Sequence, residues 1–208
     1  MKKIAVVFLF LSAVSLCFAN GRRNGVEAGI GYHRMAETQS VSGIDVKTTI
    51  PSVAINFAAM TYFTEWAGVG MYGNIFFPQH IKFVLLGQPI TVNRSAYDSL
   101  WGMDLLAGPV IMLYHSRFFS LPVSFGFHYS GLWTKAGGIK ASQNEIGLGA
   151  NITGNFHFTQ SIYMYGRFQS AYDFYSWEKT KENGTIESNS GKVSVWSIEP
   201  CLGIGFRW

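Results

Sequence analysis

The final stretch of the chain, residues 196–208, constrains the fold more than any other segment. Apolar side chains occupy every second position in it, and small or charged residues such as Gly203 and Glu199 stand between them. A period of two places alternate side chains on opposite faces of a β-strand. One face of this strand is therefore apolar, with an aromatic residue at each end, Trp196 and Trp208. Such a face turns either into the core of a soluble sheet or outward to lipid.

The beginning of the chain carries a predicted secretory signal. A short basic start precedes an apolar run over residues 4–16, and Ala19 ends a cleavage site of small residues. This pattern predicts a signal peptide over residues 1–19 and a mature domain over residues 20–208. The run is too short for a transmembrane helix, which needs about 20 residues. A lipoprotein signal acylated at Cys17 is the alternative, although the residue before the cysteine is not small.

The composition suits a strand-based membrane protein. Aromatic residues make up 16% of the chain and charged residues 13%, and the apolar residues after the signal are spread through alternating segments, as in transmembrane strands. The formal net charge is +4, and the basic residues are scattered rather than clustered, so we expect no nucleic-acid partner. Cys201 is the only cysteine after the predicted signal, which excludes a disulfide framework.

Eight segments show the alternation of a strand, and the connections between them alternate in length. Long polar stretches lie near residues 36–49, 78–98, 134–142 and 178–191, and tight turns lie near 64–65, 115–117 and 159–161. This sidedness is typical of short periplasmic turns and longer external loops. It predicts an all-β fold, an eight-stranded antiparallel transmembrane up-and-down β-barrel. The predicted strands cover residues 26–33, 52–63, 67–77, 101–113, 121–130, 145–158, 162–174 and 196–208.

A soluble lipocalin-like barrel is the alternative, but its apolar face should point inward. Here the face opposite the apolar one carries Glu145, Arg167, Asp173 and many glycines. Those residues suit a narrow polar lumen better than a cavity for an apolar ligand.

The terminal strand resembles the C-terminal strand of bacterial outer-membrane β-barrels, which ends in Phe or Trp and is read by the barrel-assembly machinery. The matching positions are Leu202, Ile204, Phe206 and Trp208. The mature chain is similar to small eight-stranded barrels of the OmpX, OmpW and OmpA-transmembrane type. This resemblance implies the bacterial outer membrane as the location, with outer-membrane lipid and the assembly machinery as partners. Since fold alone does not determine activity, it leaves the function open; we expect no enzymatic activity and no cofactor.

Charged residues on the predicted inward face form a candidate network. Eight strands enclose an interior just wide enough for side chains to fill it, so charges there should pair and make a polar core rather than an ion path. Arg167 is predicted to pair with Glu199, with Asp104 or Glu145 as alternative acids. The inward set comprises Arg167, Glu199, Asp104, Glu145 and His33, together with Glu27, Asp173, His128 and His157.

A hydrolytic site is a further alternative. His128 and Ser130 lie on one face of a strand, and the stretch resembles the His-Tyr-Ser segment of lipid A deacylases of the PagL type. Gly131 stands where that family has Asn. The resemblance implies a Ser–His pair, for which Glu145 could be the acid; inward polar packing is the simpler explanation. The histidines show no metal-ligand spacing, so the sequence predicts no metal site.

The long segment 78–98 carries a candidate contact surface. Ile81, Phe83 and Leu85 continue an apolar row beyond the expected membrane edge, and apolar residues there suggest a binding surface. They could instead pack on neighbouring loops or touch the lipid head-group layer. The predicted function is an outer-membrane barrel that presents loops for surface interaction or adhesion, with a host or cell-surface ligand. A narrow channel for small or hydrophobic solutes is the alternative.

Overall fold

The computed structural model describes residues 23–41, 44–182 and 185–208, so the predicted signal peptide lies outside the described residues. The described chain consists of β-strands and one short 3₁₀ helix, η1 (Arg94–Ala96). None of its helices has the length and hydropathy of a membrane span. The strands are β1 (Arg23–Val41), β2 (Ile44–Tyr62), β3 (Ala67–Pro78), β4 (His80–Leu85), β5 (Gln88–Asn93), β6 (Ser99–His115), β7 (Phe119–Ala136), β8 (Ile139–His157), β9 (Ile162–Glu182) and β10 (Thr185–Arg207).

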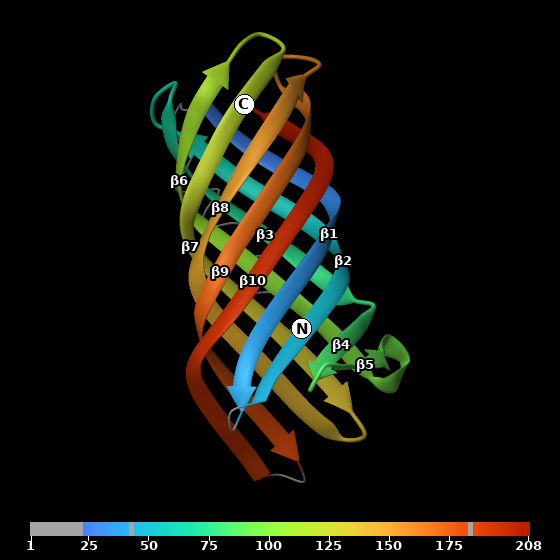
Figure 1. The fold of residues 1–208 in the computed structure, drawn as a ribbon. Helices are drawn as coiled ribbons and strands as arrows, with labels where there is room; N and C mark the ends of the chain where they lie inside the picture. Colours follow the sequence, from blue (N-terminus) through green and yellow to red (C-terminus); the bar gives the residue numbers. More distant parts are fainter. Residues whose placement is uncertain (1–22, 42–43, 183–184) are drawn as a thin grey trace.

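The strands form one antiparallel sheet that closes on itself. Its order is β1-β10-β9-β8-β7-β6-β3-β2-β4-β5, and an additional pairing of β1 with β2 completes a ring. β4 and β5 form a hairpin outside this closure, attached through β4 to β2 near its start. Figure 1 shows the ring as a tilted cylinder with the C-terminus at the end opposite the β9–β10 hairpin tip.

The predicted strand count of eight was too low for the sheet as a whole, which has ten strands among the described residues. The two additional strands are β4 and β5, in the segment 78–98 that the sequence predicted as a loop. Three further predicted loops were also wrong in part, because residues 36–41, 44–49, 134–136, 139–142, 178–182 and 185–191 continue as paired strands. Strand pairing outside a membrane needs no apolar row, so polar strand extensions carry no signal in the alternation pattern.

The tight turns were predicted correctly. The chain reverses at residues 63–66, 116–118 and 158–161, and a similar bond closes each turn: Phe63 N–H donates to Ala67 O, Ser116 N–H to Phe119 O and Phe158 N–H to Ile162 O. These turns lie together at the end of the ring that carries the C-terminus (Figure 1).

The predicted inward and outward faces are confirmed along the ring. Apolar side chains on the outer face are widely exposed, as shown by Ile30 (70%), Phe127 (80%) and Leu202 (66%). Inward neighbours on the same strands, such as His33, His128 and Glu199, are at most 3% exposed. The molecule therefore has an apolar outside and a polar, filled inside, the reverse of a soluble barrel.

Aromatic rings fill part of the lumen by lying over glycines. Tyr163 and Tyr165 of β9 are 3% and 0% exposed. A Cβ atom added at Gly205 would lie 2.1 Å from Tyr163 Cζ, and one added at Gly203 would lie 2.7 Å from Tyr165 Cε1. Glycine at these β10 positions therefore leaves the space that the two rings occupy.

Candidate functional site in the lumen

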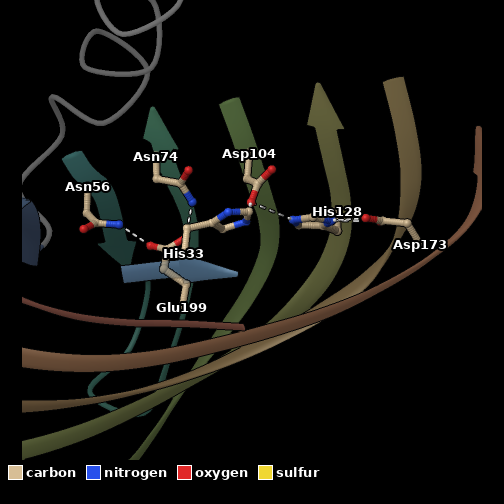
Figure 2. Close-up of polar contacts among 7 residues, drawn as sticks. All are labelled: His33, Asn56, Asn74, Asp104, His128, Asp173 and Glu199. Atoms are coloured by element: carbon tan, nitrogen blue, oxygen red, sulfur yellow. Dashed lines mark hydrogen bonds and ion pairs between the residues drawn. The ribbon is translucent and has the colours of Figure 1, made fainter. Parts of the chain in front are cut away.

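A line of buried carboxylates and imidazoles crosses the lumen (Figure 2). Its members come from β10, β1, β6, β7 and β9 in turn, and each is 3% exposed or less. His33 Nε2 lies 2.6 Å from Asp104 Oδ2, and His128 Nε2 lies 4.0 Å from the same oxygen. The five residues are Glu199, His33, Asp104, His128 and Asp173.

Strand register explains why polar side chains meet at this level. Asn56 of β2 is paired with Asn74 of β3, and Asn74 is paired in turn with Asp104 of β6. Asp104 is then paired with Ser130 of β7. All of these side chains point into the lumen, so paired residues form a polar row across the inner faces of β2, β3, β6 and β7.

Hydrogen bonds hold the two ends of the line. Asn56 and Asn74 each donate a side-chain amide hydrogen bond to the carboxylate of Glu199. At the other end, His128 Nδ1 lies 2.8 Å and 3.1 Å from the two carboxylate oxygens of Asp173. His33 stacks on Phe76 with ring centroids 4.2 Å apart, which fixes the plane of its imidazole.

Arg167 belongs to a second polar centre, and the predicted pair with Glu199 is wrong. Its guanidinium forms an ion pair with Glu27 of β1, and Tyr163 Oη donates a 3.1 Å hydrogen bond to the same carboxylate. The guanidinium carbon also lies 4.7 Å and 4.9 Å from the ring centroids of Tyr72 and Tyr165.

Register accounts for this change of partner. Arg167 stands directly opposite Cys201, whereas Glu199 stands opposite Gln169 and faces the amides across the lumen. The sequence predicted correctly that the Arg167 side chain points into the lumen. It could not predict the ion-pair partner of Arg167, because the partner depends on which long side chains reach one another across the ring.

Glu145 of β8 is paired with Ser130 in the register but makes no hydrogen bond or ion pair to either centre within the described chain. It accepts a 2.7 Å hydrogen bond from Gln143 Nε2, and the same amide nitrogen lies 3.2 Å from Glu37 Oε2. Glu145 is therefore not the acid of the predicted hydrolytic site, because Asp173 is the carboxylate that contacts His128.

The predicted contact residues of segment 78–98 divide into two groups. Ile81 is 5% exposed and belongs to an apolar cluster with Ile50, Phe76 and Leu100, and Phe83 packs against that cluster. Leu85 is 38% exposed. The prediction that all three continue the outer row was wrong. Strand β3 ends at Pro78, and the next strand, β4, pairs with β2 and does not continue the pairing of β3 with β6.

The four residues of the terminal strand motif face outward as predicted. Leu202, Ile204, Phe206 and Trp208 are between 47% and 66% exposed. Asn24 N–H donates to Trp208 O, and Trp208 N–H donates to Asn24 O, so the last residue helps to join β10 to β1.

No family model matches the sequence, and no curated protein matches it. Solved structures share the fold. The outer membrane protein AlkL, determined in lipid bilayers, has a TM-score of 0.60 at 10% identity over 91% of each chain. A major outer membrane protein from Thermus thermophilus has a TM-score of 0.53 at 13% identity, over 91% of this chain and 100% of that chain. Neisserial surface protein A has a TM-score of 0.52 at 12% identity, over 89% and 97%.

These comparisons confirm the predicted resemblance. The chain has the fold of small outer-membrane β-barrels. In this chain the β4–β5 hairpin is attached to the ring through β2.

Proposed function

We propose that this chain is an integral protein of the bacterial outer membrane that binds a partner through its long hairpins and has a closed lumen. The proposal rests on the contrast between an interior filled by buried side chains and long hairpins that extend beyond the ring at one end (Figure 1). β9 and β10 have 21 and 23 residues, whereas a transmembrane strand needs only about 9–11. The excess length lies outside a bilayer.

The packing of the interior supports a lumen that does not conduct. Large side chains such as Tyr72, Phe76 and Leu106 are at most 1% exposed, and the Arg167–Glu27 pair fills the space beside Tyr72. The ring without the β4–β5 hairpin has eight strands, and a ring of that size has little free space beyond such side chains.

The tip of the β4–β5 hairpin supports a binding role. Leu85 is paired with Gln88, so Leu86 and Gly87 form a two-residue turn, with φ angles of 50° and 79°. Such turns favour Asn-Gly, because both residues need positive φ. A leucine there is strained by about 1–2 kcal/mol, and its side chain is 74% exposed. Strain that brings an apolar side chain to the surface is typical of functional positions, and Ile90, 52% exposed, lies nearby on β5.

Cysteine labelling in intact cells tests the proposed location and orientation. Leu86→Cys should react with a membrane-impermeant maleimide in intact cells, because the hairpin tip would face the outside. Gln160→Cys, in a tight turn at the opposite end, is the matched control and should react only after the cells are opened. The native Cys201 is buried and should stay silent. Equal labelling of both positions in intact cells would contradict the proposal.

Planar-bilayer conductance tests the closed lumen. The purified protein should show no steady single-channel current, since buried side chains fill the ring. The narrow channel is the second candidate, and a reproducible small conductance would favour it.

The burial of His128 and Ser130, at 2% and 1% exposure, supports a role without hydrolysis. A substrate would need access to both side chains. Loss of an acyl chain from lipid A on incubation with the purified protein would overturn this part of the proposal.

A further inference from the structure

Three potential metal ligands converge inside the ring. One ligand atom each from His33, Asp104 and Glu199 lies within 4.8 Å of the others. The residues come from β1, β6 and β10 and are 0%, 1% and 3% exposed. The ligand types, one imidazole nitrogen and two carboxylate oxygens, are those that bind divalent transition-metal ions.

Several polar atoms near the point where His33, Asp104 and Glu199 converge make no hydrogen bond. His33 Nε2 is close to Asp104 but is not aligned for a hydrogen bond, and Asp104 Oδ1 has no partner within the described chain. His128 Nε2 is likewise without a hydrogen-bond partner among the described residues, although its side chain is buried and points toward Asp104 (Figure 2). Buried polar atoms without partners are costly, and a cation would use these lone pairs.

The surrounding contacts resemble the supports of a metal site. A histidine that binds a metal usually donates its other ring N–H to a carboxylate, which fixes the tautomer. The contact between His128 Nδ1 and Asp173 leaves Nε2 free as a lone-pair donor. Asn56 and Asn74 hold the Glu199 carboxylate in place, and stacking on Phe76 holds the His33 ring.

The negative charge of the carboxylates in this line also favours binding of a cation. Three carboxylates, those of Asp104, Asp173 and Glu199, meet two histidines in this line, and none of the seven residues drawn in Figure 2 is Lys or Arg. Arg167 is paired with Glu27, and its charge acts on Glu199 only at longer range. Protonation of the imidazoles or of a carboxyl group is one source of compensation; a single divalent ion is another, and it would also occupy the lone pairs.

We propose that His33, Asp104 and Glu199 bind one divalent transition-metal ion of the zinc class, with His128 as the fourth ligand. Zinc bonds of about 2.0–2.2 Å place the ligand atoms of a tetrahedral site roughly 3.4 Å apart. The ligand atoms of His33, Asp104 and Glu199 lie within 4.8 Å of one another, so they move together by side-chain rotation when the ion binds. His128 Nε2, now 4.0 Å from Asp104 Oδ2, moves in as the fourth ligand. Because the site is closed on all sides by the lumen packing, the ion enters while the ring assembles.

Metal content after refolding tests the proposal. The full mature chain is refolded in detergent with Zn²⁺ or with a chelator, desalted, and analysed for zinc by mass spectrometry. We expect one zinc ion per folded chain, retained during brief exposure to chelator, and a higher thermal midpoint than for chain refolded without metal. Refolding with Co²⁺ should give the intense visible absorption of a tetrahedral site.

Variants separate this site from adventitious binding. Asp104→Asn and Glu199→Gln keep the side-chain shape and should each weaken zinc binding at least tenfold, with loss of the cobalt spectrum. His80→Gln, a histidine on β4 outside the lumen line, is the control and should retain one ion. Heat-modifiable migration on gels verifies that each variant has folded. If Asp104→Asn or Glu199→Gln does not fold, the same zinc and cobalt measurements are made on His33→Gln.

A wild-type chain that folds without retaining zinc above the level of Asp104→Asn would overturn the proposal. So would a cobalt spectrum that His33→Gln and Asp104→Asn leave unchanged. Either result would leave protonation of the imidazoles or of a carboxyl group as the source of charge compensation. Neither outcome bears on the closed lumen or the hairpin surface.

Discussion

Arg167 is a buried cation held between two aromatic rings and one carboxylate, Glu27. Removing one partner of a buried ion pair costs about 3–5 kcal/mol, because the other charge is left without compensation. We therefore expect Glu27→Ala and Arg167→Ala to lower the free energy of unfolding by this amount, measured by denaturant titration in detergent.

Paired replacements identify the partner. The double variant Arg167→Met with Glu27→Leu should recover much of the stability, since apolar side chains of similar volume can replace a buried pair. Arg167→Met combined with Glu199→Leu should not recover it, because Glu27 would stay unpaired. Equal recovery in both double variants would show that Glu27 is not the partner.

Gly205 is predicted to tolerate no side chain. A Cβ atom there would lie 2.1 Å from Tyr163 Cζ, a distance that forces the ring or the backbone to move. Overpacking of this kind costs about 1–3 kcal/mol, so Gly205→Ala should lower the denaturation midpoint clearly. Gly191→Ala on the same strand is the matched control, because nothing lies within 4 Å of its added Cβ. Its effect should stay within about 0.5 kcal/mol.

The β4–β5 hairpin combines a buried base with a strained tip. Ile81 anchors it in the apolar cluster, while Leu86 has a positive φ of 50° that a bulky side chain rarely adopts. Leu86→Asn should relieve the backbone strain and raise the free energy of local opening of the hairpin by about 1–2 kcal/mol. Proteolytic cleavage of the hairpin should slow in proportion, because a protease cuts the locally opened state. Faster cleavage than in the wild type would show that the leucine side chain stabilises the tip.

The long hairpins show what the alternation pattern can and cannot detect. Within a membrane each strand must turn apolar residues outward, so 26–33, 121–130 and 196–208 were recognisable from a period of two. The strand extensions of β9 and β10 are mostly polar and have no alternating apolar row, and only backbone pairing such as Lys181 with Ile186 defines them. These segments were predicted as loops because the prediction relied on the alternation of apolar and polar side chains.

In the complete ring, the inward and outward faces followed from local pattern, because alternate side chains along a regular strand point to opposite faces. Contacts across the lumen did not follow. The cluster of His33, Asp104 and Glu199 joins residues from β1, β6 and β10, and no spacing within one segment could indicate it. Ring closure and strand shear determine that meeting, and both are properties of the complete ring.

Ring closure also assigns a role to the last residues of the chain. Trp208 exchanges two backbone hydrogen bonds with Asn24, and Phe206 is paired with Val26, so these residues join the last strand to the first. Phe206 and Trp208 also present stacked rings to the outside, 5.8 Å apart. We expect deletion of Phe206-Arg207-Trp208 to leave the protein in the periplasm, as measured by membrane fractionation and heat-modifiable migration.

Two further measurements separate closure from recognition by the assembly machinery. Trp208→Ser keeps the backbone bonds and removes one ring, so it should refold into detergent normally but insert poorly in cells; Trp208→Phe, which keeps an aromatic ring, is the control. The deletion should fail in both settings, because it also removes the bonds to β1. Normal insertion of the deleted chain in cells would show that neither the bonds nor the rings at this end are needed.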